Sequence, residues 1–283
     1  MKPVRAELRI DCRCRLGEGV LWNSDEARLY WVDIEAGRLY RWDLAGDPEH
    51  FDLAAKLGGF VFGDDGSILL FGEDGLIRRW DGGEPTVVAQ APGEVGGRFN
   101  DVSATPSGEV LCGTMPIGDR PGTLYLLDLG GNLTPILPDV GCSNGIGFSP
   151  DRKWVYFTDT RRRTIYRSPL EAPFLPATFR PEPFIVVPEG RGGPDGLCVD
   201  AEGGIWSARW GGNGVVRYTP EGEEDFWVEL PVPQATSCAF GGPDLRTLFI
   251  TSAGYDGPEI AGGLFSAEVP FAGQPEPTAR VRT

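Results

Sequence analysis

Histidine is almost absent from this chain, because His50 is the only one among its 283 residues. It lies in the segment DPEHFDLAA, where polar residues give way to apolar ones, and we expect it at the surface. Catalysis by a Ser–His–Asp or Cys–His group is then excluded, and so is a metal site with two histidine ligands. Hydrolytic chemistry in such a chain would have to rest on a metal ion and carboxylates.

Long apolar runs and basic residues are also scarce. No run of about 18 apolar residues could span a membrane, and the N-terminal MKPVRAELRI lacks the apolar core of a secretory signal, so we expect a cytoplasmic protein. The 26 basic residues are outnumbered by 41 acidic ones, for a net charge of -15. This charge disfavours nucleic acid and membranes as partners and favours a metal cation or a neutral small molecule.

The six cysteines do not complete a zinc motif. Cys12 and Cys14 have the close spacing of metal ligands, but no second pair accompanies them. We therefore expect reduced thiols, as is usual in the cytoplasm, with Cys12 and Cys14 on one face of a single strand.

Glycine and proline are abundant, and similar turns recur along the chain. The turns read NSDEAR, GDDG, TPSG, SPDRK, DAEGG and GGPDLR, and they begin at Asn23, Gly63, Thr105, Ser149, Asp200 and Gly241. Strand-like segments flank each turn, and long helical periodicity is missing. A period near 40 to 50 residues built from strands alone is typical of propeller blades. The sequence therefore predicts an all-β, six-bladed β-propeller with four antiparallel strands per blade, forming one domain over residues 1–283.

The ends of the chain should close the ring. We expect the N-terminal VRAELRID to supply the outer strand of the last blade, with the C-terminal ARVRT as the rival for that place. A monomer or weak homodimer is expected.

One position in each repeat, five residues before the turn, is informative. Because the first strand of each blade lines the central channel, these positions should form a ring around the axis. They are Glu18, Gly58, Asn100, Asn144, Asp195 and Thr236. Four of them carry carboxylate or amide oxygens, the ligands that hard divalent cations prefer. Each alone is also typical of turn capping, but four in one register favour a metal site in the channel.

Neighbouring residues suggest a substrate site above this ring. Arg98 lies two residues before Asn100, so an extended strand would point both side chains the same way, where Arg98 could hold a substrate oxygen. A salt bridge at the rim is the alternative for Arg98. Asp101 alternates to the other side and is interpreted as a turn or backbone anchor. Trp210, in SARWGGNG, is a candidate pocket wall.

The motifs LGEGVLW, RFND, SNGIGFSPD, PDGLCVDAEGGIW and TSCAFGG resemble the gluconolactonase family that includes senescence marker protein 30 (regucalcin), and WGG, FGGPDLRTLF and AGGLF resemble its bacterial sugar-acid lactonases. The resemblance implies a six-bladed propeller with one divalent metal ion that hydrolyses sugar lactones. By motif, Glu18, Asn144 and Asp195 would be the metal ligands, and Arg98 and Asn100 would bind substrate.

Two departures from the family pattern concern the substrate pocket. Phe99 stands where proline is common, which could change the pocket wall. In the loop GTMPIGDRPG, Asp119 is the only acid available to contact substrate hydroxyls.

The function expected from these observations is metal-dependent hydrolysis of an aldonolactone to its aldonic acid. The metal would polarise the lactone carbonyl, and Asp195 would act as general base and then acid. Ca²⁺ is the favoured ion, with Zn²⁺, Mg²⁺, Mn²⁺ and Fe²⁺ as alternatives. The competing hypotheses are hydrolysis of other esters or phosphotriesters, a non-catalytic metal- or sugar-binding regulator, and a protein-interaction propeller.

Overall fold

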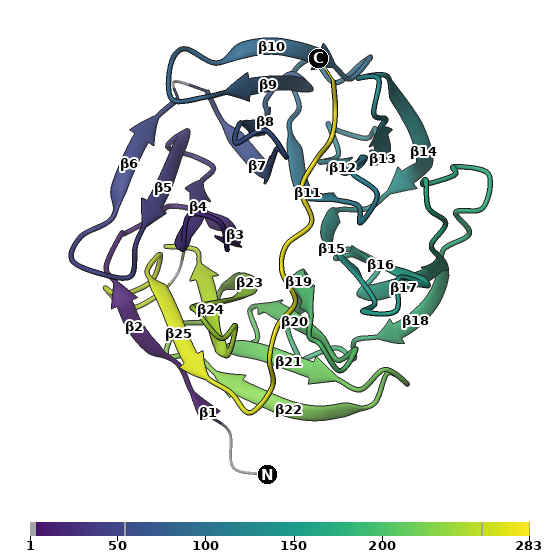
Figure 1. The fold of residues 1–283 in the computed structure, drawn as a ribbon. Helices are drawn as coiled ribbons and strands as arrows, with labels where there is room; N and C mark the ends of the chain where they lie inside the picture. Colours follow the sequence, from purple (N-terminus) through teal and green to yellow (C-terminus); the bar gives the residue numbers. More distant parts are fainter. Residues whose placement is uncertain (1–3, 54, 256, 283) are drawn as a thin grey trace.

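A computed structural model describes residues 4–53, 55–255 and 257–282. In this part of the chain the strands form six sheets that surround a central channel (Figure 1). The first three sheets are β3 (Gly17–Asn23), β4 (Arg28–Asp33), β5 (Arg38–Trp42) and β6 (Glu49–Asp52); β7 (Leu57–Phe62), β8 (Ile68–Gly72), β9 (Leu76–Trp80) and β10 (Thr86–Gln90); and β11 (Phe99–Ala104), β12 (Val110–Thr114), β13 (Gly122–Leu127) and β14 (Leu133–Val140).

The other three sheets complete the ring. They are β15 (Ser143–Phe148), β16 (Trp154–Asp159), β17 (Thr164–Pro169) and β18 (Glu182–Val186); β19 (Gly193–Val199), β20 (Ile205–Trp210), β21 (Gly214–Tyr218) and β22 (Glu224–Glu229); and β23 (Ala235–Gly241), β24 (Thr247–Ser252), β25 (Leu264–Glu268) and β2 (Glu7–Ile10). Neighbouring strands of these six four-stranded blades pair antiparallel, so the predicted six-bladed propeller is confirmed.

The N-terminus closes the ring, as predicted. Strand β2 pairs antiparallel with β25 as the outer strand of the sixth blade. Strand β1 (Val4–Arg5) adds a short parallel edge to β22 in the fifth blade. Because the first and last parts of the chain share one sheet, the sixth blade joins both ends of the propeller.

Each blade buries both faces of its middle strands against the neighbouring blades. In β4, Leu29 and Trp31 pack toward the sixth blade, whereas Tyr30 and Val32 pack toward the second blade. Trp31 stacks on Tyr40 with ring centroids 4.9 Å apart. This burial on both sides explains why the second strands read as continuous apolar runs rather than as alternating ones.

The C-terminal segment from Gln274 to Arg282, here called the strap, crosses the channel at one end (Figure 1). Gln274 Nε2 donates to backbone carbonyls at the ends of β15 and β19, and Ala279 pairs with Gly63 just after β7. The rival proposal that ARVRT closes the last blade is therefore wrong, although Thr283 lies outside the described residues. The strap therefore lies at the end of the channel where the inner strands end, and the end where they begin is not crossed by it.

Two further predictions are tested by the fold. His50 is exposed on the outer strand of the first blade, as expected. The segment from Cys12 to Cys14 is not a strand, because it lies between the end of β2 and the start of β3, and Arg13 adopts a left-handed conformation with φ 50°. Among the described residues, the structure has no helix long and apolar enough to cross a membrane.

Candidate functional site

In the described part of the chain, all six inner strands carry a β-bulge at or beside the predicted ring position. In each blade the pairing between the inner strand and the second strand shifts by one residue there, as between Glu18 and Leu21 in β3 and between Asn144 and Ile146 in β15. A bulge leaves an extra residue unpaired and turns its side chain away from strict alternation. Side chains of the six blades can therefore converge on the channel axis at this level.

The two ring positions without charged or amide groups have structural reasons for being small. A Cβ atom on Gly58 would lie 2.0 Å from the carbonyl oxygen of Phe99, so only glycine allows the second and third blades to approach so closely. Thr236 donates its hydroxyl to the Gly17 carbonyl (2.6 Å), which joins the sixth blade to the first beside Glu18.

The asparagine side chains of the third and fourth blades are joined in a directed network. Asn100 Nδ2 donates to Asn144 Oδ1 (2.8 Å) and to the Ser143 carbonyl (2.7 Å). Asn144 Nδ2 donates to Thr160 Oγ1 (2.7 Å), whose hydroxyl donates to the Pro194 carbonyl (2.7 Å). This network turns the Asn144 oxygen, rather than its nitrogen, toward Asn100, and it ties β15 to the start of β19. The sequence reading did not identify Thr160.

Three carboxyl groups, two of them buried and that of Asp101 half-buried, influence one another at this level of the channel. Burial, followed by the charges of Asp195 and Asp101, raises the pKa of Glu18 well above its usual value. Burial and the Asp101 charge likewise raise the pKa of Asp195. Burial also raises the pKa of Asp101, to about 7. The Arg98 guanidinium lowers the pKa of all three groups but does not outweigh these effects.

The position of Asp101 contradicts the prediction that it alternates away from the channel. The bulge of β11 lies between Phe99 and Val102, so the alternation rule does not hold at this point. Asp101 instead lines the channel, and its charge acts on both Glu18 and Asp195. Its carboxylate accepts no hydrogen bond from any described residue, so it is not a turn anchor.

Arg98 lies against the predicted ring. Its Nη1 donates to the Phe99 carbonyl (2.9 Å) and to Asn100 Oδ1, and burial lowers its pKa. The alternative of a rim salt bridge has no support in the described residues, because Arg98 forms no ion pair there. Phe99 is fully buried and packs edge-on against Phe71 with ring centroids 5.4 Å apart, so it belongs to the core between two blades and not to a pocket wall.

Asp119 lies on the exposed loop between β12 and β13, and no described residue forms a hydrogen bond or ion pair with its side chain. The loop itself is held firmly at its base. Arg120 donates to the buried Glu94 through both terminal nitrogens (3.4 and 3.2 Å), and Tyr125 donates its hydroxyl to Glu94 (3.1 Å). Ile117 packs directly on Gly97, because a Cβ atom added to Gly97 would lie only 2.4 Å from the Cδ1 atom of Ile117.

Two aspartates that were not predicted hold the starts of inner strands. Asp33, at the end of β4, accepts hydrogen bonds from the backbone amides of residues 15 and 16, just before Glu18. Asp159, at the end of β16, accepts from the amides of residues 141 and 142, just before Asn144. The signal was present in the sequence, because WVDIE and YFTDT place an aspartate at the same position in two repeats.

Toward the strap, the channel widens into a cavity of about 320 Å³. Inner-strand residues such as Phe60 and Ile146 form its walls, and the strap contributes Glu276 and Arg280. Burial raises the pKa of Glu276 to about 7. The cavity separates the strap from the level of Glu18 and Asp195, so the two ends of the channel have different chemical surroundings.

The predicted ligand residues fit a hard cation. Glu18, Asn144 and Asp195 offer only oxygen donors, and the raised pKa values show that the two carboxylates are poorly stabilised by the protein alone. The described residues contain no cluster of three or more His, Cys, Asp or Glu side chains that could hold a metal, which is consistent with a set that needs an amide oxygen.

Comparison with known proteins identifies the family. The model of the SMP-30/Gluconolactonase/LRE-like region matches residues 16–254. The chain belongs to this family. The resemblance inferred from the motifs is therefore confirmed, and the matched segment includes every predicted site residue.

Relatives in this family span almost the whole chain. Pentonolactonase XacC from Haloferax volcanii is 42% identical to this protein over 288 residues, covering 96% of this chain and 97% of that protein. L-arabinolactonase from Azospirillum brasilense is 35% identical, covering 95% and 93%. The solved structure of regucalcin from Agrobacterium tumefaciens, described as a calcium-binding protein, matches with a TM-score of 0.90 at 31% identity, covering 99% and 98%.

Proposed function

We propose that this protein is a metal-dependent lactonase that hydrolyses a sugar lactone to the corresponding aldonic acid. The observation that carries the proposal is the raised pKa of the buried carboxyl groups of Glu18 and Asp195, caused by burial and by the charge of the half-buried Asp101, beside the Asn100–Asn144 amide pair. Arg98 lies next to this group, at the end of the channel that the strap leaves uncovered. The relatives named as lactonases support the same reaction class.

Glu18, Asn144 and Asp195 would hold one divalent metal ion, with Ca²⁺ favoured because every donor is a hard oxygen. When bound, the ion supplies electrostatic polarisation of the lactone carbonyl. The residues around the ligands prepare this site: Thr160 orients the Asn144 amide, and Asp101 adds negative charge behind Asp195.

In the reaction, the protein positions an ester and moves one proton. Asp195 accepts a proton from the attacking water and returns it to the ring oxygen as the carbon–oxygen bond of the ester breaks. Arg98 and Asn100 orient the ester and ring hydroxyls through hydrogen bonds. Asp119, on the loop held by Glu94, would contact a substrate hydroxyl. We also propose that the protein acts as a monomer or weak homodimer.

The test is a lactone panel with metal-stripped and reloaded protein. Proton release from pentono- and hexonolactones is followed with a pH indicator, and spontaneous hydrolysis is subtracted. We expect metal-dependent turnover, strongest on five-carbon lactones because two relatives are named for pentonolactone and arabinolactone activity. Metal loading should weaken as the pH falls, because the pKa of Asp195 is raised in the metal-free site and protonation competes with metal binding. Metal binding with no turnover of any lactone would overturn the proposal.

A regulator that binds metal without catalysis is the second candidate, because the Agrobacterium regucalcin is described as a calcium-binding protein. It predicts tight calcium binding and no acceleration of any lactone. Turnover of phosphotriesters or simple esters, with sugar lactones left intact, would instead indicate the other hydrolase class.

A further inference from the structure

We propose that Cys12 and Cys14 are a site of oxidative modification, where a hydroperoxide converts the two thiols to a disulfide. The sulfur atoms are 3.5 Å apart, with the Cys14 thiol donating to the Cys12 sulfur. A disulfide bond is about 2.05 Å long, so the sulfurs need to approach by only about 1.5 Å. The inference does not rest on the proposed function.

The backbone between the two cysteines brings their side chains together. Arg13 has φ 50°, in the left-handed region, so the chain turns here instead of running extended. The segment is held on both sides, because the Cys14 amide donates to the Gly262 carbonyl (2.9 Å) and the Cys14 carbonyl accepts from the Gly254 amide (3.1 Å). The close approach of the thiols is therefore built into the junction between the sixth and first blades.

A buried donor makes the site suitable for a thiolate. The indole Nε1 of Trp31 is fully buried and points to the two thiols, without a well-formed hydrogen bond to any described residue. The hydrogen bond from Cys14, assisted by the Trp31 N–H, lowers the pKa of Cys12, against the effect of burial. The hydrogen bond to Cys12 and burial raise the pKa of Cys14. Cys12 is also the more exposed of the two, so it is the nucleophile and Cys14 the resolving thiol.

The chemistry is balanced with hydrogen peroxide as the oxidant. The Cys12 thiolate attacks one peroxide oxygen, so a sulfur–oxygen bond forms, the oxygen–oxygen bond breaks and hydroxide leaves. The Cys14 sulfur then attacks the Cys12 sulfenic acid, forming the disulfide as hydroxide leaves and takes up the Cys14 proton. Two thiols and one peroxide give one disulfide and two waters.

The protein contains an internal control pair. Cys198 and Cys238 have sulfur atoms 3.8 Å apart on the inner strands β19 and β23. Burial raises the pKa of Cys198 well above its usual value, and the pair faces the channel cavity instead of the outer surface. Proximity alone would oxidise both pairs at similar rates, whereas thiolate stabilisation selects Cys12 and Cys14.

The experiment treats reduced, folded protein with hydrogen peroxide, blocks the remaining thiols and maps tryptic peptides without reduction. Because Arg13 lies between the cysteines, trypsin separates residues 10–13 from residues 14–15 unless a disulfide joins them. We expect this linked pair to form at least ten times faster than a link between Cys198 and Cys238. Equal rates, or no link at Cys12 and Cys14, would overturn the proposal.

Two variants identify the roles of the thiols. Cys14→Ser should stop at a Cys12 sulfenic acid that dimedone traps, whereas Cys12→Ser should leave Cys14 unlabelled. Trp31→Phe keeps an aromatic ring but removes the N–H, so we expect several-fold slower oxidation. The assignment of roles would be contradicted if dimedone labelled Cys14 in the Cys12→Ser variant as fast as it labels Cys12 in the Cys14→Ser variant. If a variant fails to fold, the peptide map of the unmodified protein decides the proposal.

Discussion

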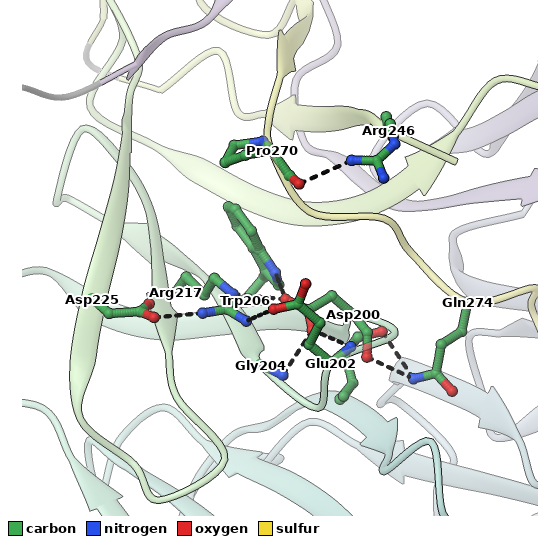
Figure 2. Close-up of polar contacts among 10 residues, drawn as sticks. Asp200, Glu202, Gly204, Trp206, Arg217, Asp225, Arg246, Pro270 and Gln274 are labelled. Carbon is green, nitrogen blue, oxygen red and sulfur yellow. Dashed lines mark hydrogen bonds and ion pairs between the residues drawn. The ribbon is translucent and has the colours of Figure 1, made fainter. Parts of the chain in front are cut away.

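Asp195 and Asp200 are two buried aspartates only five residues apart, and their surroundings differ completely. Asp200 lies at the strap end of the channel, where its side chain accepts from two backbone amides, Trp206 Nε1 (2.8 Å) and Arg217 Nε (2.6 Å) (Figure 2). Asp195 lies at the opposite end, where the backbone amide of Gly196 is its only donor among the described residues.

The difference separates a structural charge from one that we propose to be functional. The strap end uses its charges internally: Arg217 also bonds Asp225, Arg246 Nη1 donates to the Pro270 carbonyl (2.9 Å), and Gln274 donates to the Asp200 carbonyl (3.3 Å) (Figure 2). The open end gives its carboxylates few partners, because Glu18 accepts from the Gly19 amide (3.2 Å) and Asp195 from the Gly196 amide. A buried charge with few protein partners is stable only if it is neutralised or binds a cation. The scarcity of partners, and not burial alone, therefore marks a candidate functional site.

The largest expected effect is on activity, in Asp195→Asn. We expect lactone turnover to fall by about 10²–10⁴-fold, the usual range for loss of a general base. At pH 8 the metal-free variant should also melt at a higher temperature than the unmodified protein, because one poorly solvated negative charge is gone. Initial rates and thermal melting of metal-free protein measure both. Asp200→Asn is the matched control. A similar loss of activity in that variant would show that the two aspartates do not differ in role.

The same change at the strap end should act on stability instead. Asp200→Asn leaves the buried Arg217 guanidinium without its main partner, and removing one member of a buried pair costs about 3–5 kcal/mol of the free energy of unfolding. Urea denaturation measures the loss. Under conditions where the Asp200→Asn variant is folded, it should keep the kcat/KM of the unmodified protein. A fall in kcat/KM without loss of stability would contradict the structural role of Asp200.

Glu276→Gln tests the acid that faces the cavity. The pKa of Glu276 is raised to about 7 in the folded protein, above its value in the unfolded chain. Between these two pKa values the folded state binds a proton that the unfolded state has lost, so the free energy of unfolding falls as the pH rises through this range. Glutamine removes this penalty and should stabilise the protein at pH 8 by roughly 1–3 kcal/mol, with little change at pH 4. Denaturation curves at both pH values measure it. An equal gain in the free energy of unfolding at pH 8 and pH 4 would show that the effect does not come from titration of Glu276.

Gln274→Ala should give the smallest effect. It removes the side-chain donor that the carbonyls of Phe148, Val199 and Asp200 share, at an expected cost of about 1 kcal/mol. Hydrogen exchange of the strap amides should speed up while amides near Asn144 stay protected. Faster exchange at both ends of the channel would show that the two regions are coupled.

Repeats and turns were sufficient to predict the propeller, because each blade is a local unit whose strand pattern recurs in the sequence. They also placed Glu18, Asn144 and Asp195 at equivalent positions on their inner strands. Two kinds of residue escaped prediction. Asp101 was assigned to the wrong side because a bulge interrupts alternation in β11. Asp33, Asp159 and Thr160 were overlooked because their partners are backbone groups or side chains of another strand.

The amino-acid order by itself determined the blade count, since this follows from periodicity, and it predicted the oxygen donors from their shared position in the repeats. Only the tertiary structure decided which carboxylates have few partners, that the strap crosses one end of the channel, and that Cys12 and Cys14 meet beside the Trp31 indole. These features depend on bulges, a left-handed residue and contacts between distant blades. Their energies arise between segments far apart in the chain, where no local pattern records them.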